Sequence, residues 1–168
     1  LPQTYTFELQ KLTDSCKSFE GEEALEIFKR SITNEQFKKI KNFDLKPLAS
    51  ASLAQVHTAN LIENNQEIVI KILRPNISKK VNSNIKLLKL FAFFVKILFK
   101  DSYRLKINQV VNDYERTILK EIDLRLEANN TIQTRENFLD SNLLYIPSVY
   151  KEFTNKNVLV MERIYGTP

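Results

Sequence analysis

The sequence predicts an α+β domain built on an antiparallel sheet, and three observations lead to this fold class. Apolar residues recur at helical spacing before residue 43 and again between residues 77 and 138. Two strand-like runs joined by a polar turn follow the first helical region, and a second pair of such runs follows the other. Helices and hairpins in this order are typical of an α+β architecture with an antiparallel sheet.

The first helical region covers residues 5–43, with breaks expected at residues 33–34 and 42–44. The strands that follow are predicted at residues 53–61 and 67–73, around a polar turn at residues 63–66. Pro75 ends the second strand because proline cannot supply a ladder donor. The apolar positions of the first region are Phe7, Leu9, Leu12, Ala24, Leu25, Ile27, Phe28, Ile32 and Phe37.

The second helical region, residues 77–138, is predicted to form two helices with a break near residues 100–102. Two more strands are predicted at residues 143–147 and 157–161. The chain starts without a methionine or a signal segment and stops after Gly166-Thr-Pro168 at no evident boundary, so we expect it to be a fragment.

The composition agrees with one soluble domain that has a substantial core. The chain has 168 residues, of which 43% are hydrophobic and 27% charged. Lone Cys16 excludes an intrachain disulfide and favours a reducing compartment. The mild net charge of +5 favours an anionic partner, whether nucleotide, nucleic acid or acidic lipid.

The most informative stretch combines a turn of small residues with a lysine in an apolar strand. Alanine and serine dominate residues 49–54, and Lys71 lies between Ile70 and Ile72. The N–H groups of such a turn can point at phosphate oxygens, as those of the glycine-rich hairpin in the protein-kinase fold do. An unpaired strand ammonium is costly, so a carboxylate partner is expected. The alternatives are a packed small-residue turn and a lysine that faces solvent on an edge strand.

Three carboxylates in the predicted helix 110–138 are candidates for the partner of Lys71. Asp123 and Glu127 are four residues apart and share a helix face, whereas Glu121 is turned away from Glu127. All three could instead belong to an ordinary solvated acidic face.

Four blocks of sequence resemble the UbiB family of atypical kinase-like proteins, most closely its bacterial members. They are PLASASLAQVHTA at residues 47–59, VIKILRP at 69–75, EIDLRLEA at 121–128 and VMERIYG at 160–166. The blocks occur in family order and with family spacing, and the similarity covers about residue 43 to the end. The resemblance implies a kinase-like N-terminal lobe over residues 44–168, with an Ala-rich loop, inserted helices and a hinge, after a helical N-terminal extension at residues 1–43.

The resemblance also implies roles for particular residues. Glu127 would pair with Lys71, while Glu121 and Asp123 would form a regulatory ion pair with a Lys-x-Gly-Gln lysine, a motif that this chain lacks. Backbone groups near Glu162 and Ile164 would bind the adenine edge. The whole nucleotide-binding set is Ala49, Ser50, Ala51, Ser52, Leu53, Ala54, Val56, Lys71, Glu127, Glu162 and Ile164.

The function implied by the resemblance is an ATP-dependent kinase or ATPase that supports ubiquinone biosynthesis. Its partners would be a nucleotide with Mg²⁺, and lipid quinone precursors or other proteins of that pathway. The family's catalytic and metal-binding aspartates would lie beyond residue 168, so the expected catalytic and metal-ligand sets in this chain are empty and the chain alone is expected not to turn over ATP. The full-length protein would lie on the cytoplasmic face of the bacterial inner membrane, with this fragment soluble or peripheral.

A different class of function is suggested by the helix expected at residues 85–99. Its lysines form a basic stripe opposite an aromatic and aliphatic face, as in helices that lie in an anionic membrane interface. The alternative is a core helix with a solvated lysine face. The stripe consists of Lys86, Lys89, Lys96 and Lys100.

Two further classes of function are disfavoured by the sequence. The single histidine, His57, has no cysteine or carboxylate cluster near it, so local packing or hydrogen bonding is expected rather than metal binding. Nucleic-acid binding is not expected, because the basic residues are dispersed and no recognition motif is visible.

Overall fold

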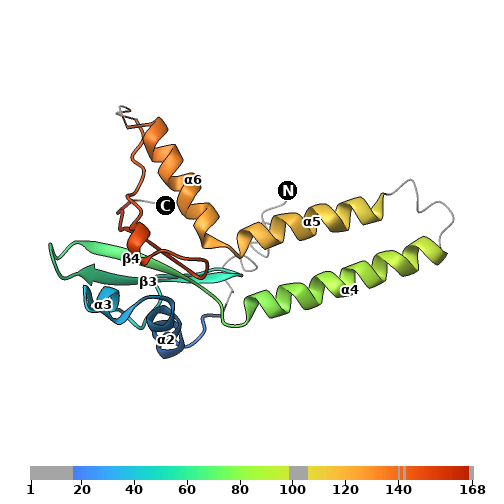
Figure 1. Ribbon diagram of the computed structural model, residues 1–168, viewed down its shortest axis with the longest axis horizontal. Coiled ribbons are helices and arrows are strands. Elements are labelled where there is room, and N and C mark those ends of the chain that lie inside the picture. Colours follow the sequence, from blue (N-terminus) through green and yellow to red (C-terminus); the bar gives the residue numbers. More distant parts are fainter. Residues whose placement is uncertain (1–16, 99–105, 140, 142, 167–168) are drawn as a thin grey trace, which may run out of the picture.

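A curled antiparallel sheet lies at the centre of the computed structural model, which describes residues 17–98, 106–139, 141 and 143–166. The strand order is β1-β3-β4-β5, and β2 also pairs with β3. This mixture of helices and antiparallel sheet confirms the predicted α+β class (Figure 1). The elements are α2 Gly21–Ser31, α3 Asn34–Phe37, β1 Ile40–Lys41, β2 Ala49–Ser50, β3 Ala54–Leu61, β4 Glu67–Leu73, α4 Ile77–Leu98, α5 Ile107–Glu121, α6 Leu124–Asn137, η2 Lys151–Phe153 and β5 Val158–Glu162.

The two long strands β3 and β4 agree with the prediction to within one residue at each end. Asparagines take the left-handed backbone conformation at three of the expected breaks, with φ of 54° at Asn42, 57° at Asn65 and 57° at Asn76. Asparagine tolerates this conformation better than most residues. In a chain with only two glycines, asparagine therefore takes over much of the turn chemistry.

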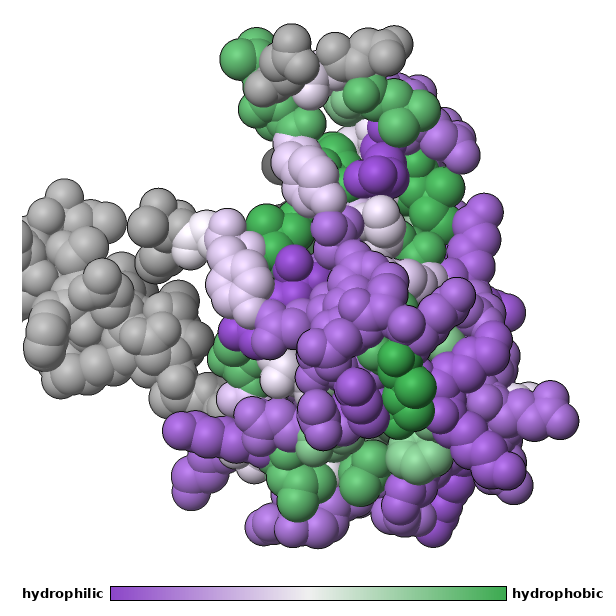
Figure 2. All heavy atoms as spheres, turned by 90° about the vertical axis from the view of Figure 1, so that its left-hand side faces the viewer, coloured by the Kyte–Doolittle hydropathy of each residue, from purple (hydrophilic) through white to green (hydrophobic). Residues whose placement is uncertain are grey.

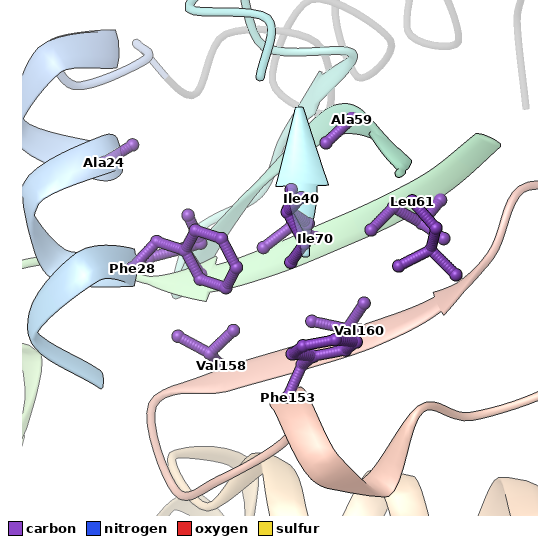
Figure 3. Close-up of a cluster of buried hydrophobic side chains, with 11 residues drawn as sticks. Ala24, Phe28, Ile40, Ala59, Leu61, Ile70, Phe153, Val158 and Val160 are labelled. Carbon is purple, nitrogen blue, oxygen red and sulfur yellow. The ribbon is translucent and has the colours of Figure 1, made fainter. Parts of the chain in front are cut away.

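One face of the sheet packs against α2 (Figure 3). Phe28 from α2, Ile70 from β4 and Val160 from β5 are all fully buried there. Phe153 of η2 closes the same cluster, and β1 contributes Ile40. Residues on both sides of position 43 thus build one core, while the predicted domain boundary at that position stays a prediction.

The opposite face of the sheet packs against the start of α4 and the junction of α5 and α6. Leu73 and Leu159 from the sheet meet Val81, Ile122 and Leu124 from the helices, and all five side chains are buried. Because side chains alternate along a strand, Ile70 and Ile72 face α2, whereas Lys71 faces the side of α6.

The predicted strand at residues 143–147 is wrong. Leu143 is 94% exposed, and pairing with β5 begins only further on, with the single bridge between Val149 and Met161. Pro147 has no N–H to offer a ladder, which explains why an apolar run in this place does not become a strand. The other strand of this pair is correct, shifted by one residue.

The predicted continuous helix over residues 110–138 is wrong, because it consists of α5 and α6. Ile122 turns into the core at the junction, where it is 2% exposed. Asp123 then caps α6, its side chain accepting a hydrogen bond from the Arg125 N–H. The end of the predicted first helical region is also wrong, since Ile40 and Lys41 form β1.

The pair α4 and α5 projects from one end of the sheet as a helical hairpin (Figure 1). The opposite end of the molecule presents a largely hydrophilic face (Figure 2). Among the described residues, no helix has the length and apolar character needed to cross a membrane. The predicted break near residues 100–102, and Phe7, Leu9, Leu12 and Cys16, lie outside the described residues.

Candidate functional site

An ion pair joins the central strand β4 to helix α6. The ammonium nitrogen of Lys71 donates hydrogen bonds to both carboxylate oxygens of Glu127, each at 2.7 Å. The two side chains are 28% and 42% exposed, so the pair lies over the α6 side of the sheet, partly open to solvent, rather than in the core. Lys71 is therefore less buried than the sequence suggested, and it could reach a ligand without leaving the strand.

The ion pair lines a cleft of about 1060 Å³ between α6 and the sheet. Met161 of β5 and Pro147 contribute apolar surface, whereas α5 and α6 contribute most of the polar groups. Glu121 and Asp123 also line this cleft, so the structure brings together Lys71 and all three of its candidate partners. The lining residues that sequence reasoning did not single out are Thr117, Lys120, Leu126, Asn130, Thr131, Thr134 and Ile146. Six of them lie in α5 or α6 and follow an ordinary helical pattern, and Ile146 lies in a connecting segment, so none carried a signal.

The structure separates the roles of the three carboxylates. Only Glu127 contacts Lys71, while Asp123 is paired with Arg125 at 2.6 Å and caps α6. The guanidinium of Arg125 lowers the pKa of Asp123 through its hydrogen bond. Glu121 ends α5 and faces the cleft without an ion pair among the described residues.

The Ala-rich segment forms a tight hairpin between β2 and β3. Ala49 and Ser50 pair with Val56 and Gln55, and the Ala51 N–H donates to the Ala54 carbonyl at 2.8 Å. The N–H groups of Ser52 and Leu53 make no hydrogen bond to any other described residue. Ser52 and Leu53, which belong to the predicted set at residues 49–54, therefore keep a backbone donor available for an anion. Val56 lies directly opposite Lys71 in the sheet.

The predicted hinge residues follow β5. The Glu162 carboxylate accepts hydrogen bonds from the Tyr145 hydroxyl at 2.6 Å and from the Ser148 N–H at 3.1 Å. Burial alone would raise the pKa of Glu162, but these hydrogen bonds outweigh it and the pKa is lowered. Ile164 is 47% exposed, and its N–H makes no hydrogen bond to another described residue. The side chain of Glu162 is thus occupied, and its N–H donates to the Ser148 carbonyl at 2.9 Å, so backbone recognition of a ligand here is left to the Glu162 carbonyl and the Ile164 N–H.

These features define the N-terminal lobe of a kinase-like protein: a curled antiparallel sheet, a strand lysine paired with a helix glutamate, and a small-residue hairpin beside them. A family model described as the ABC1 atypical kinase-like domain matches residues 11–168. The chain belongs to this family.

Several curated relatives carry the name "Probable protein kinase UbiB". The one from Tolumonas auensis is 46% identical over 168 residues, which is all of this chain and 31% of the relative. The one from Erwinia tasmaniensis is 44% identical over 161 residues, or 96% of this chain and 30% of the relative. The chain therefore spans about a third of the length of the curated relatives it matches, and the resemblance to the UbiB family is confirmed.

Nucleotide and metal place different demands on the site. The Lys71 ammonium and the donors of Ser52 and Leu53 have the chemistry that phosphate oxygens require. Within the described ranges, no group of three His, Cys, Asp or Glu side chains could hold a metal ion. Lys71, Ser52 and Leu53 therefore fit the anionic part of a nucleotide, and no metal ligand is assigned.

His57 is held in one tautomer by a buried hydrogen-bond chain behind the hairpin. Its Nδ1 lies 2.8 Å from the Asp44 carbonyl oxygen, which can only accept, so Nδ1 carries the proton. Nε2 then accepts from the Gln55 amide nitrogen, also at 2.8 Å. The ring stacks on Phe43 at 4.9 Å between centroids, in line with the expected local hydrogen bonding.

Acidification is expected to destabilise the lobe through His57. Because burial lowers its pKa below the ordinary 6.5, the unfolded chain binds the proton first. The contribution of His57 to stability is complete above about pH 6.5 and is lost below it, by at most about 1.4 kcal/mol per pH unit. Urea unfolding at about pH 7.5 and about pH 5.5 measures the loss. His57→Gln cannot titrate and should show a smaller difference; an equal difference in both proteins would contradict this assignment.

Proposed function

We propose that this chain is the nucleotide-binding lobe of an atypical kinase or ATPase that supports ubiquinone biosynthesis, with ATP as its nucleotide. The observation that carries the proposal is the bidentate hydrogen bonding of the Lys71 ammonium by Glu127 at the edge of the cleft. In kinases a strand lysine held by a helix glutamate in this way binds nucleotide phosphates. Membership of the ABC1 atypical kinase-like family supports the same function.

In this proposal each part of the site binds one part of the nucleotide. Lys71 and the free N–H groups of Ser52 and Leu53 hold phosphate oxygens. Backbone groups of Glu162 and Ile164 bind the adenine edge, with Met161 behind the base. Bound Mg²⁺ would neutralise phosphate charge, and its ligands are not proposed among the residues of this chain. No catalytic residue is proposed here either.

The wider role is proposed from the family. The substrate would be a lipid quinone precursor, or ATP hydrolysis would drive the assembly of a biosynthetic complex on the cytoplasmic face of the bacterial inner membrane. Glu121 is proposed to remain available for a regulatory ion pair, because it faces the cleft and binds no cation among the described residues. Asp123 already binds Arg125, so its part in such a pair would require an exchange of partners.

The nucleotide proposal is tested by competition binding. A fluorescent ADP analogue is titrated with the 168-residue chain, and unlabelled ATP and adenosine are then added as competitors. We expect saturable binding that ATP displaces at much lower concentration than adenosine, because the strongest contacts are to phosphates. Binding that both competitors displace equally, or no saturable binding, would overturn the proposal.

A second candidate function is docking of α4 on an anionic lipid surface. Leu87, Phe91, Phe94 and Leu98 are between 51% and 71% exposed, which supports this candidate, whereas the start of α4 packs into the core through Val81 and Ile85. Helix α4 carries five lysines and no acidic residue, which complements anionic headgroups. Lys89 is paired with Glu115 of α5 at 2.5 Å, so the basic stripe borders α5. Lys86 and Lys96 are exposed, and Lys100 lies outside the described residues.

Vesicle co-sedimentation tests the lipid surface. We expect the chain to bind vesicles that contain phosphatidylglycerol and to bind pure phosphatidylcholine vesicles weakly, since charge and apolar burial act together. Replacing both Phe91 and Phe94 by serine should weaken binding by roughly tenfold or more. Leu143→Ser, at a fully exposed position away from α4, is the matched control. Equal loss of vesicle binding in both variants, or equal binding to both kinds of vesicle, would exclude the exposed face of α4 as a docking surface for anionic lipid.

A further inference from the structure

The Ala-rich hairpin is fastened by Arg74, the residue that follows β4. The Arg74 guanidinium donates to the Ala51 carbonyl from Nε at 3.0 Å and from Nη2 at 2.9 Å. Nη2 also donates to the Ser50 hydroxyl at 3.0 Å. In addition, the backbone N–H of Arg74 donates to the Leu53 carbonyl at 2.9 Å. One residue thus binds three residues of the turn, Ser50, Ala51 and Leu53.

Arg74 reaches the turn from the α2 side of the sheet. Its guanidinium lies 5.8 Å from the centre of the Phe19 ring, and Phe19 packs against the core beneath α2. The backbone of Phe19 is held in turn by Gln55, whose amide accepts from the Phe19 N–H at 3.0 Å and donates to the Phe19 carbonyl at 3.2 Å. Gln55 is fully buried, so its two hydrogen bonds hold the backbone of Phe19, and with it the ring beside Arg74, in one position.

Because a peptide group is planar, the contacts of Arg74 with the turn also fix the direction of the free Ser52 N–H. The Ala51 carbonyl and the Ser52 N–H belong to one trans peptide group, in which they point in opposite directions. A carbonyl held by Arg74 on the α2 side therefore turns the Ser52 N–H away from that side. The Leu53 carbonyl, which shares a peptide group with the Ala54 N–H, is held by the Arg74 N–H, so the far end of the turn is also fixed. Lys71 lies on the face away from α2.

We infer that Arg74 is a positioning residue, which fixes the Ala-rich turn so that the Ser52 N–H is presented to phosphate together with Lys71. This inference rests on the proposed nucleotide site. Alanine and serine give the turn some stiffness, and Arg74 supplies the orientation that their backbone alone does not. Lysine would be a poorer substitute, because its single ammonium nitrogen cannot reproduce the two donors, Nε and Nη2, that the planar guanidinium places on the Ala51 carbonyl.

The test combines the mobility of the turn with ligand affinity. In the whole chain, ¹⁵N relaxation is measured for Ser52 and Leu53 in wild type, Arg74→Gln, Arg74→Lys and the control Arg116→Gln, an exposed arginine on α5. Both Arg74 variants should lower the order parameters of the turn from about 0.85 toward 0.6, and the control should not. Their affinity for ADP should fall roughly tenfold, while adenosine binding stays unchanged.

The two readouts separate the possible failures. Unchanged order parameters in both Arg74 variants would overturn the inference, whatever happens to ADP binding. If Arg74 had a merely structural role, its replacement would lower the melting temperature and weaken the binding of ADP and adenosine equally. That result would also contradict a positioning role. A wild-type chain that binds no ADP would overturn the proposed function, whereas the relaxation data would still decide whether Arg74 orders the turn. Ser50→Ala removes one of the three hydrogen bonds that the guanidinium makes with the turn and should give an intermediate effect.

Discussion

Replacement of Phe28 by alanine is expected to lower the free energy of unfolding of the whole lobe by about 3–5 kcal/mol. Phe28 is fully buried at the centre of the core between α2 and the sheet (Figure 3). Its ring stacks on Phe43 at 6.0 Å and meets the edge of Phe37 at 6.1 Å. The loss combines the transfer of a large apolar side chain to water with the cavity left behind.

Chemical unfolding followed by fluorescence and by circular dichroism measures this loss. The control is Phe138→Ala, because that ring is 43% exposed and its removal should cost far less. The experiment also tests the predicted boundary at residue 43. If residues 17–43 formed a separate unit, Phe28→Ala would leave the unfolding of the sheet unchanged, and the common core described above would be contradicted.

The second large effect is expected on nucleotide binding when Lys71 is replaced by alanine. Charge-assisted hydrogen bonds contribute about 1.5–3 kcal/mol, so the affinity for ADP should fall by roughly 10- to 100-fold. The fold should survive, because the pair with Glu127 is partly exposed and such pairs contribute about 0–1 kcal/mol. Competition binding and thermal unfolding on the same sample separate the two effects.

A charge exchange sharpens this experiment. The double variant Lys71→Glu with Glu127→Lys keeps one ammonium and one carboxylate at the pair, but it moves the positive charge from the strand to α6. We expect the double variant to retain stability and still to lose ADP binding, because phosphate recognition requires the ammonium on β4. Recovery of ADP affinity in the double variant would show that the ammonium can bind phosphate equally well from α6, and it would contradict the role given to Lys71.

The sheet was the part of the fold most open to prediction. Strand β4 has isoleucine at every second position, strands β3 and β4 are bounded by clear turn signals, and three asparagines take the left-handed conformation at expected breaks. The partnership of Lys71 and Glu127 followed from the resemblance to the UbiB family. Periodicity alone placed Asp123 and Glu127 on one helix face, turned Glu121 away from Glu127 and left the partner of Lys71 open, since one continuous helix was assumed.

The features that the sequence could not show depend on tertiary packing. The division between α5 and α6 arises because Ile122 turns into the core and Asp123 caps the next helix. The apolar run at residues 143–145 lacks a partner strand and remains exposed, which no local pattern reveals. Arg74 was visible only as a residue that ends a strand, and its contacts with Ala51 and Ser50 depend on how the hairpin curls back.

The most direct test of the nucleotide site is a map of backbone amide shifts in the ¹⁵N-labelled chain as MgADP is added. The account predicts the largest changes at Ser52 and Leu53, with accompanying changes at Lys71 and Ile164. Amides on the outer surface of α2, such as that of Glu26, should not move. Changes confined to α2 or to the α4–α5 hairpin, with Ser52 and Leu53 unaffected at saturation, would contradict a phosphate site at the Ala-rich turn.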